Sequence, residues 1–160
     1  MQKAEQLFEE GSIGEMGTPA QASVRANTEA LRQAQQIYEK LVKNTPKIEH
    51  NYSVMHRLSR TYIELARQSE GSQRVDYLAK AKNYLKTIRE AHETSSVESI
   101  QADYATALIA ELCGDYQTAI DVADTALGSL GEEAQEHYVK RQLLSLTERC
   151  NRLATPNRAG

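Results

Sequence analysis

Apolar residues recur along most of this chain at intervals of three and four, which is the period of one face of an α-helix. Glycine and proline number only eight and three in 160 residues, and no Asn-Gly or Asp-Gly hairpin turn occurs. The pattern therefore predicts an all-α fold. The segments that carry a helical stripe span residues 3–10, 18–44, 49–68, 74–92, 96–113, 116–130 and 132–153.

Three of these stripes begin with an alanine and continue four and then seven residues later. Because the alanine side chain is small, a neighbouring helix can approach closely at that point, and we expect successive helices to pack side by side there. The three stripes are Ala34, Tyr38 and Leu41; Ala81, Leu85 and Ile88; and Ala119, Ala123 and Ala126.

Several polar residues stand where helices should begin. Ser95 or Ser96 can cap the helix that starts near residue 96, and Asp115 can cap the helix after it. Only Cys113 and Gly114 separate Asp115 from the preceding helix. So short a turn predicts that these two helices are antiparallel neighbours.

Two segments carry a family resemblance. Residues 113–120, Cys-Gly-Asp-Tyr-Gln-Thr-Ala-Ile, followed by Ala126 and Leu127, resemble the turn and second helix of a tetratricopeptide repeat (TPR). The series Met55-x-x-Leu58-Ser59-x-x-Tyr62 is similar to the first-helix signature of that family. The resemblance covers roughly residues 29–130. The repeats are degenerate, and a related helical-hairpin family is the alternative.

The resemblance implies antiparallel helical hairpins stacked as a right-handed solenoid, with the last helix as a C-terminal cap. We expect one domain over residues 1–154 and a flexible tail over residues 155–160. The family's concave face binds an extended peptide or a partner helix. A subset grips chaperone termini through Lys and Asn side chains, which the matching stretches lack, so that role is not assigned. The expected groove residues are Tyr52, His56, Arg60, Gln101, Tyr104 and Leu108.

Charge is strongly segregated along the chain, although the net charge is only −3. Residues 90–136 contain eleven acidic residues and no Lys or Arg, whereas residues 47–89 and 137–160 carry +5 and +4. The acidic block would repel a phosphate backbone, so nucleic acid is not an expected partner. We expect an acidic surface that meets a basic protein, represented by Asp103, Glu111, Asp121 and Asp124.

Candidate chemistry is sparse. The two cysteines lie far apart without a CxxC pair, so we expect both to pack as small hydrophobic side chains. No HExxH, Walker or nucleophile-elbow motif is present, and we predict neither an enzyme, a cofactor nor a metal site. The residues weighed and set aside are His50, His56, His92 and His137, which lack metal-ligand spacing, and Gly11, Gly14 and Gly17, which lack the register of a phosphate loop.

A charged stripe on the helix of residues 49–68 leaves two interpretations open. Arg57, Arg60, Glu64 and Arg67 lie three or four residues apart. They form either a solvated face with an Arg60–Glu64 pair or a contact for acidic groups, from a partner or from the chain's own acidic block.

The expected function is that of a non-catalytic adaptor or scaffold that binds a protein or peptide. The first residues lack the apolar run of a secretion signal, and no stretch is apolar enough for a membrane span, so we expect a cytoplasmic protein that does not contact membrane. Three alternatives remain: a subunit or assembly factor of a larger complex that uses its acidic surface, a homo-oligomer that joins basic to acidic segments, and an export chaperone.

Overall fold

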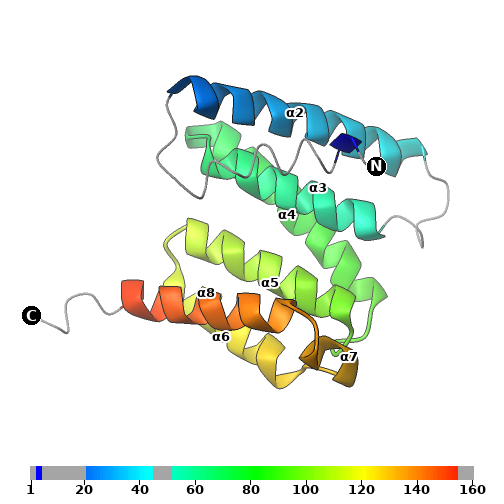
Figure 1. The fold of residues 1–160 in the computed structure, drawn as a ribbon, viewed down its shortest axis with the longest axis vertical. Coiled ribbons are helices and arrows are strands. Elements are labelled where there is room, and N and C mark those ends of the chain that lie inside the picture. Colours follow the sequence, from blue (N-terminus) through cyan, green and yellow to red (C-terminus); the bar gives the residue numbers. More distant parts are fainter. Residues whose placement is uncertain (1–2, 5–20, 45–51, 155–160) are drawn as a thin grey trace, which may run out of the picture. The chain divides into compact units, whose positions relative to one another are not determined.

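In the computed structural model, the described residues are 3–4, 21–44 and 52–154, and every regular element within them is an α-helix (Figure 1). This confirms the all-α prediction. The chain divides into two compact units, Met1–Tyr84 and Leu85–Gly160, and each is described here by itself. The predicted helix 3–10 beyond residue 4, the start of the next helix at residues 18–20, and the tail lie outside the described residues.

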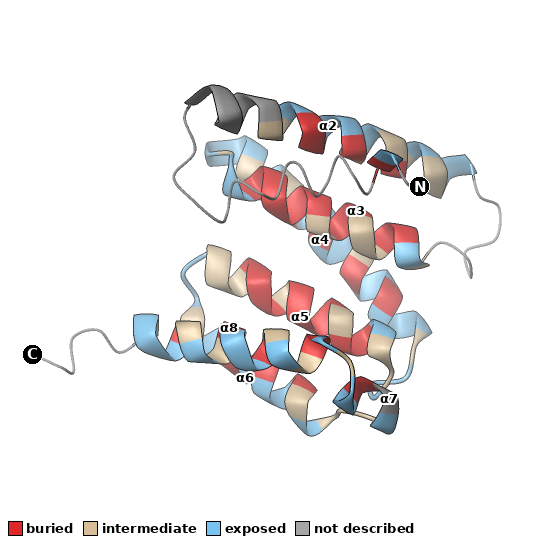
Figure 2. Cartoon of the chain, in the orientation of Figure 1, coloured by how far each residue is buried: buried red, intermediate tan, exposed pale blue. Residues whose placement is uncertain are grey.

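The first unit contains α2 (Gln21–Asn44), α3 (Tyr52–Arg67) and the first two thirds of α4 (Gly71–Ala91). Helix α2 packs against α3 and buries Leu31, Ala34 and Tyr38 on one stripe. Helix α3 is buried on most of its surface, as Figure 2 shows by colour. Its buried apolar residues include the TPR-like positions and their neighbours, Met55, Leu58, Tyr62, Ile63, Leu65 and Ala66.

Tyr62 joins three helices of this unit. Its hydroxyl donates a hydrogen bond to Glu39 of α2. Its ring stacks against Tyr77 and Tyr84 of α4, with ring centroids 6.1 and 6.3 Å away, and the ammonium of Lys80 lies 5.7 Å from the ring centroid. Burial, reinforced by the bond to Glu39, raises the pKa of Tyr62. The phenol is therefore a neutral structural tie rather than a titrating group.

The second unit contains α5 (Val97–Leu112), α6 (Tyr116–Gly128), α7 (Glu132–Gln135) and α8 (Val139–Ala154). Helices α5, α6 and α8 each pack against the other two. Alanines fill the contacts on α6, where Ala119, Ala123 and Ala126 are buried. The same core includes Ile100, Tyr104, Ala107, Leu108, Ile120, Ala134, Val139, Leu143, Leu146 and Cys150.

Two predicted caps are confirmed in the second unit. Ser96 caps α5, because its hydroxyl accepts a hydrogen bond from the Ser99 N–H at 3.2 Å. Asp115 caps α6 by accepting from the Thr118 N–H at 3.3 Å. Gly114, which immediately precedes Asp115, has a φ of +78°. Glycine adopts this backbone conformation at a lower energetic cost than residues with a side chain do. The tight turn is thus built as the sequence predicts.

Gly131 fastens the segment before α7 to the segment before α5. Its N–H donates to the carbonyl oxygen of Ser95 at 3.3 Å. A Cβ atom added at Gly131 would lie 2.9 Å from that same oxygen, closer than such contacts allow. The absence of a side chain is what permits this close approach.

The prediction of one final helix over residues 132–153 is wrong, because the structure breaks it into α7 and α8. Ala134 and Val139 are both fully buried, yet five positions along a continuous helix would turn their side chains about 140° apart. The break allows both to face the core. His137 stabilises it by accepting a hydrogen bond from the Val139 N–H at 3.1 Å.

The burial of the predicted alanines and cysteines can be compared with the structure. Ala34, Ala81 and Ala119 are each fully buried, as the alanine-led stripes predicted. Cys150 is buried as expected, but Cys113 is exposed, because it ends α5 beside the turn at Gly114. The TPR-like solenoid and the single domain stay predictions.

Candidate functional site

The predicted groove residues of the first unit share one stripe of α3. Tyr52, His56 and Arg60 follow one another at intervals of four, and each is half-buried. Within the described part of the chain, the His56 Nδ1 atom is buried and has no hydrogen-bond partner. This stripe thus combines an aromatic ring, a cation and an unsatisfied imidazole nitrogen.

The electrostatics of the stripe are set by His56. Burial, together with the positive charges of Arg60 and Arg57, lowers the pKa of its imidazole to about 4, and burial is the largest of the three causes. At neutral pH the ring is therefore uncharged. A neutral imidazole can donate one hydrogen bond and accept another, which suits it to recognise a polar group on a bound segment.

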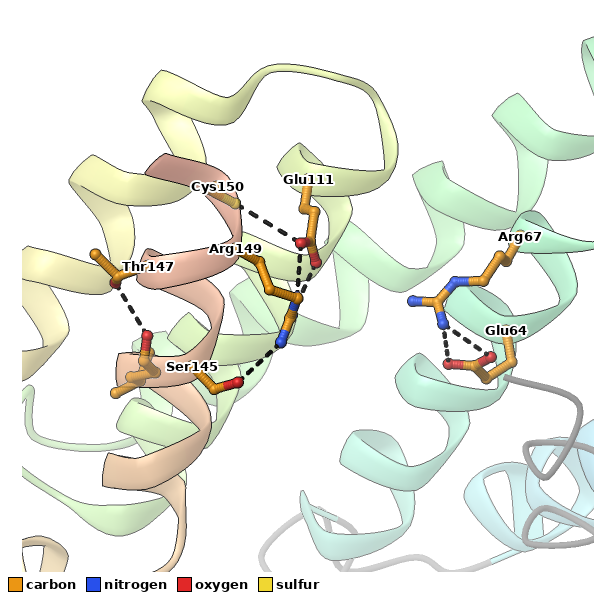
Figure 3. A network of polar contacts seen from close by, with 8 residues as sticks. Glu64, Arg67, Glu111, Ser145, Thr147, Arg149 and Cys150 are labelled. Carbon is orange, nitrogen blue, oxygen red and sulfur yellow. Dashed lines mark hydrogen bonds and ion pairs between the residues drawn. The ribbon is translucent and has the colours of Figure 1, made fainter. Parts of the chain in front are cut away.

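The charged stripe of α3 contains an ion pair between Glu64 and Arg67. Arg67 Nη1 lies 3.5 Å from Glu64 Oε1, three residues before it (Figure 3). Glu64 is almost fully buried, whereas the Arg67 side chain is one-third exposed. The structure pairs Glu64 with Arg67, and the Arg60–Glu64 pair that the sequence suggested stays a prediction.

The predicted groove residues of the second unit differ in exposure. Gln101 is half-buried on α5, but Tyr104 and Leu108 are only 8% and 4% exposed and belong to the hydrophobic core. Their main contribution is therefore to the packing of α5 against its neighbours. That the α3 and α5 residues line one groove stays a prediction.

Two of the four residues chosen for the acidic surface have partners within their own unit. Asp103 is buried, and its Oδ1 lies 2.8 Å from Arg89 Nε, an ion pair that is not aligned as a hydrogen bond. Burial raises the pKa of Asp103, and the charge of Arg89 opposes that shift. Asp121 and Asp124 are exposed on α6, so they are the part of the predicted surface that is open to a partner.

The other paired acid, Glu111, forms a bidentate ion pair with Arg149. Arg149 donates from Nε and Nη2 to the two carboxylate oxygens, both at 3.0 Å, and so joins α5 to α8 (Figure 3). The hydrogen bond to Glu111 is the main reason that the pKa of Arg149 is raised. Two parallel charged hydrogen bonds fix geometry as well as adding energy.

Cys150 adjoins this pair, with its Sγ 3.8 Å from a Glu111 oxygen. Burial, and then the negative charge of Glu111, raises the pKa of the Cys150 thiol to about 11. The thiol is thus protonated at neutral pH and unreactive while folded. Sequence reasoning missed the Glu111–Arg149 pair, since the two residues lie 38 positions apart. The only feature of the sequence that pointed to such a pair is that the acidic residues 90–136 are followed by the basic segment 137–160.

The candidates for a metal or phosphate site are the histidines and glycines singled out from the sequence. Among the described residues, no set of three or more His, Cys, Asp or Glu side chains could hold a metal ion. His50 and the glycines at 11, 14 and 17 lie outside the described residues. No described helix combines the length and apolar character that crossing a membrane requires.

Comparison with known proteins adds no relative. No family model, curated protein or solved structure matches the chain.

Proposed function

We propose that this chain is a non-catalytic adaptor that holds a peptide or a helix of another protein against α3, within a TPR-like array of stacked hairpins. The observation that carries the proposal is the half-buried stripe of Tyr52, His56 and Arg60, with its unsatisfied His56 Nδ1. A buried polar atom without a partner costs about 1–3 kcal/mol. A bound segment that supplies a hydrogen bond to this atom would recover that cost.

The packing of the helices supports the stacked arrangement in the proposal. Ala34, Ala81 and Ala119 are buried, as close helix contacts require. In the second unit, the mutual packing of α5, α6 and α8 is what two helices of one repeat and the first helix of the next would make. In this proposal α8 is the capping helix.

The proposal is tested by affinity capture from native extract with wild-type protein, Arg60→Ala and Lys86→Ala in parallel. Lys86 is the matched control because its side chain is exposed on another helix. We expect a partner that wild type and Lys86→Ala retain and that Arg60→Ala binds about tenfold more weakly, since a partly buried charged contact is worth about 1–3 kcal/mol. Equal retention by all three, with unchanged thermal melts, would reject the α3 site.

A second candidate follows from the exposed acids on α6. Asp121 and Asp124 lie on a helix without a single Lys or Arg, and they fit the role of a complex subunit that meets a basic partner. Capture through this face should weaken with rising salt and on replacing both residues by Asn. Arg60→Ala should leave it unchanged, which separates the two candidates.

A further inference from the structure

The exposed face of α8 carries residues to which the proposed adaptor function gives no role. Val139, Leu143, Leu146 and Cys150 are fully buried and occupy one side of the helix. The opposite side is exposed, as the pale blue on α8 shows in Figure 2. Leu144 stands on that side with half of its surface exposed, as Leu153 also is near the end of the helix.

Opposite charges flank the Leu144–Ser145 pair symmetrically. Arg141 lies three residues before Leu144, and Glu148 lies three residues after Ser145, so the midpoint of all four falls between Leu144 and Ser145. All four are exposed. Arg141 and Glu148 are about 10 Å apart along the helix axis, too far to pair with each other. Neither forms an ion pair with any residue that the structure describes.

We propose that this face of α8 binds the same face of a second copy of the chain, with the two α8 helices antiparallel across a two-fold axis. Such an axis at the midpoint places Arg141 of each copy opposite Glu148 of the other, so the ion pair forms twice. It also places Leu144 of each copy beside Ser145 and Leu144 of the other. The face is thus complementary to itself, which is the requirement of a two-fold contact.

The complementarity favours a second copy over an unrelated protein. A basic partner would be repelled by Arg141 and by Arg152, which is exposed on the same stripe, and an acidic one by Glu148, whereas the two-fold arrangement pairs Arg141 with Glu148. Tyr138, just before α8, is also more than half exposed, and its ring lies against His137. The apolar centre is nevertheless small, so the dimer should be weak and depend on chain concentration.

The experiment is sedimentation equilibrium of the full chain over concentrations from about 10 μM to 1 mM, a range that covers weak association. The variants are Arg141→Glu, Glu148→Arg and the double reversal. Each single reversal sets two pairs of like charges against each other, and we expect it to weaken the dimer about tenfold or more. The double reversal restores opposite charges across the axis and should restore the wild-type dissociation constant.

Glu98→Arg on α5 is the matched control. It reverses an exposed charge in the same unit but outside the proposed contact, and it should leave the dimer unchanged. A wild type that stays monomeric throughout, or a double reversal that dissociates as readily as the single variants, would overturn the proposal. Loss of the dimer in Glu98→Arg would also overturn it, because it would place the contact on a face other than that of α8.

Discussion

Replacing His56 by Gln should change how the stability of the first unit depends on pH. The pKa of His56 is lowered from 6.5 to about 4 in the folded chain, chiefly by burial and then by Arg60 and Arg57. At pH values between these two pKa values, the His56 imidazole is protonated in the unfolded chain and unprotonated in the folded chain. Stability is therefore lost as pH falls through this window and is fully present above pH 6.5.

The magnitude follows from the size of the shift. At 1.36 kcal/mol per pH unit, the full window corresponds to about 3 kcal/mol, of which about 2 kcal/mol is lost by pH 5. Gln is uncharged at every pH, so His56→Gln lacks this loss. The difference in unfolding free energy between wild type and variant should thus shift by about 2 kcal/mol, in favour of the variant, between pH 7.5 and pH 5.

The measurement is urea denaturation of both proteins at a series of pH values, followed by circular dichroism. Taking the difference between the two proteins removes the titration of groups that both share. An NMR titration of the imidazole resonances gives the pKa of His56 directly. A constant difference between the two proteins from pH 7.5 to pH 5, or an NMR pKa near 6.5, would refute the inference that Nδ1 is shielded.

Three further predictions concern the second unit. Gly131→Ala should cost about 1–3 kcal/mol in a thermal melt, because the new methyl group meets the Ser95 carbonyl, whereas Gly128→Ala, with open space around it, should be neutral or stabilising. The stability of wild type relative to Asp103→Asn should rise as pH falls from 7 toward the ordinary aspartate range, because burial raises the pKa of Asp103; a flat difference in urea denaturation would contradict this. Cys113 should react rapidly with a thiol reagent and Cys150 only when α8 opens, and equal rates would show that Cys150 is not protected.

The sequence predicted those parts of the fold that depend on local spacing. The alanine stripe of α6 and the caps at Ser96 and Asp115 are properties of a few neighbouring residues, and each was read correctly. The break between α7 and α8 was not predicted, because residues 132–153 contain no proline or glycine to mark it. It arises from the need to bury both Ala134 and Val139 against helices that are distant in sequence.

The candidate site was predictable only in part for the same reason. A period of four places Tyr52, His56 and Arg60 on one stripe of α3, but the spacing does not reveal how deeply each side chain is buried. The low pKa of His56 follows from that burial. On α5, the equivalent reasoning chose Tyr104, whose ring is largely enclosed by the core of its own unit. Solvent exposure is a tertiary property that periodicity alone does not supply.

The helix is interrupted at residues 136–138, and this interruption affects which insertions and deletions the chain can tolerate. In an unbroken helix, each inserted or deleted residue rotates everything downstream by about 100°, and a deletion would turn Leu144 inward in place of Leu143. Here the non-helical link absorbs such a change before α8 begins. The link is thus the place where length variants are expected to accumulate without disturbing the side chains that α8 presents to either side.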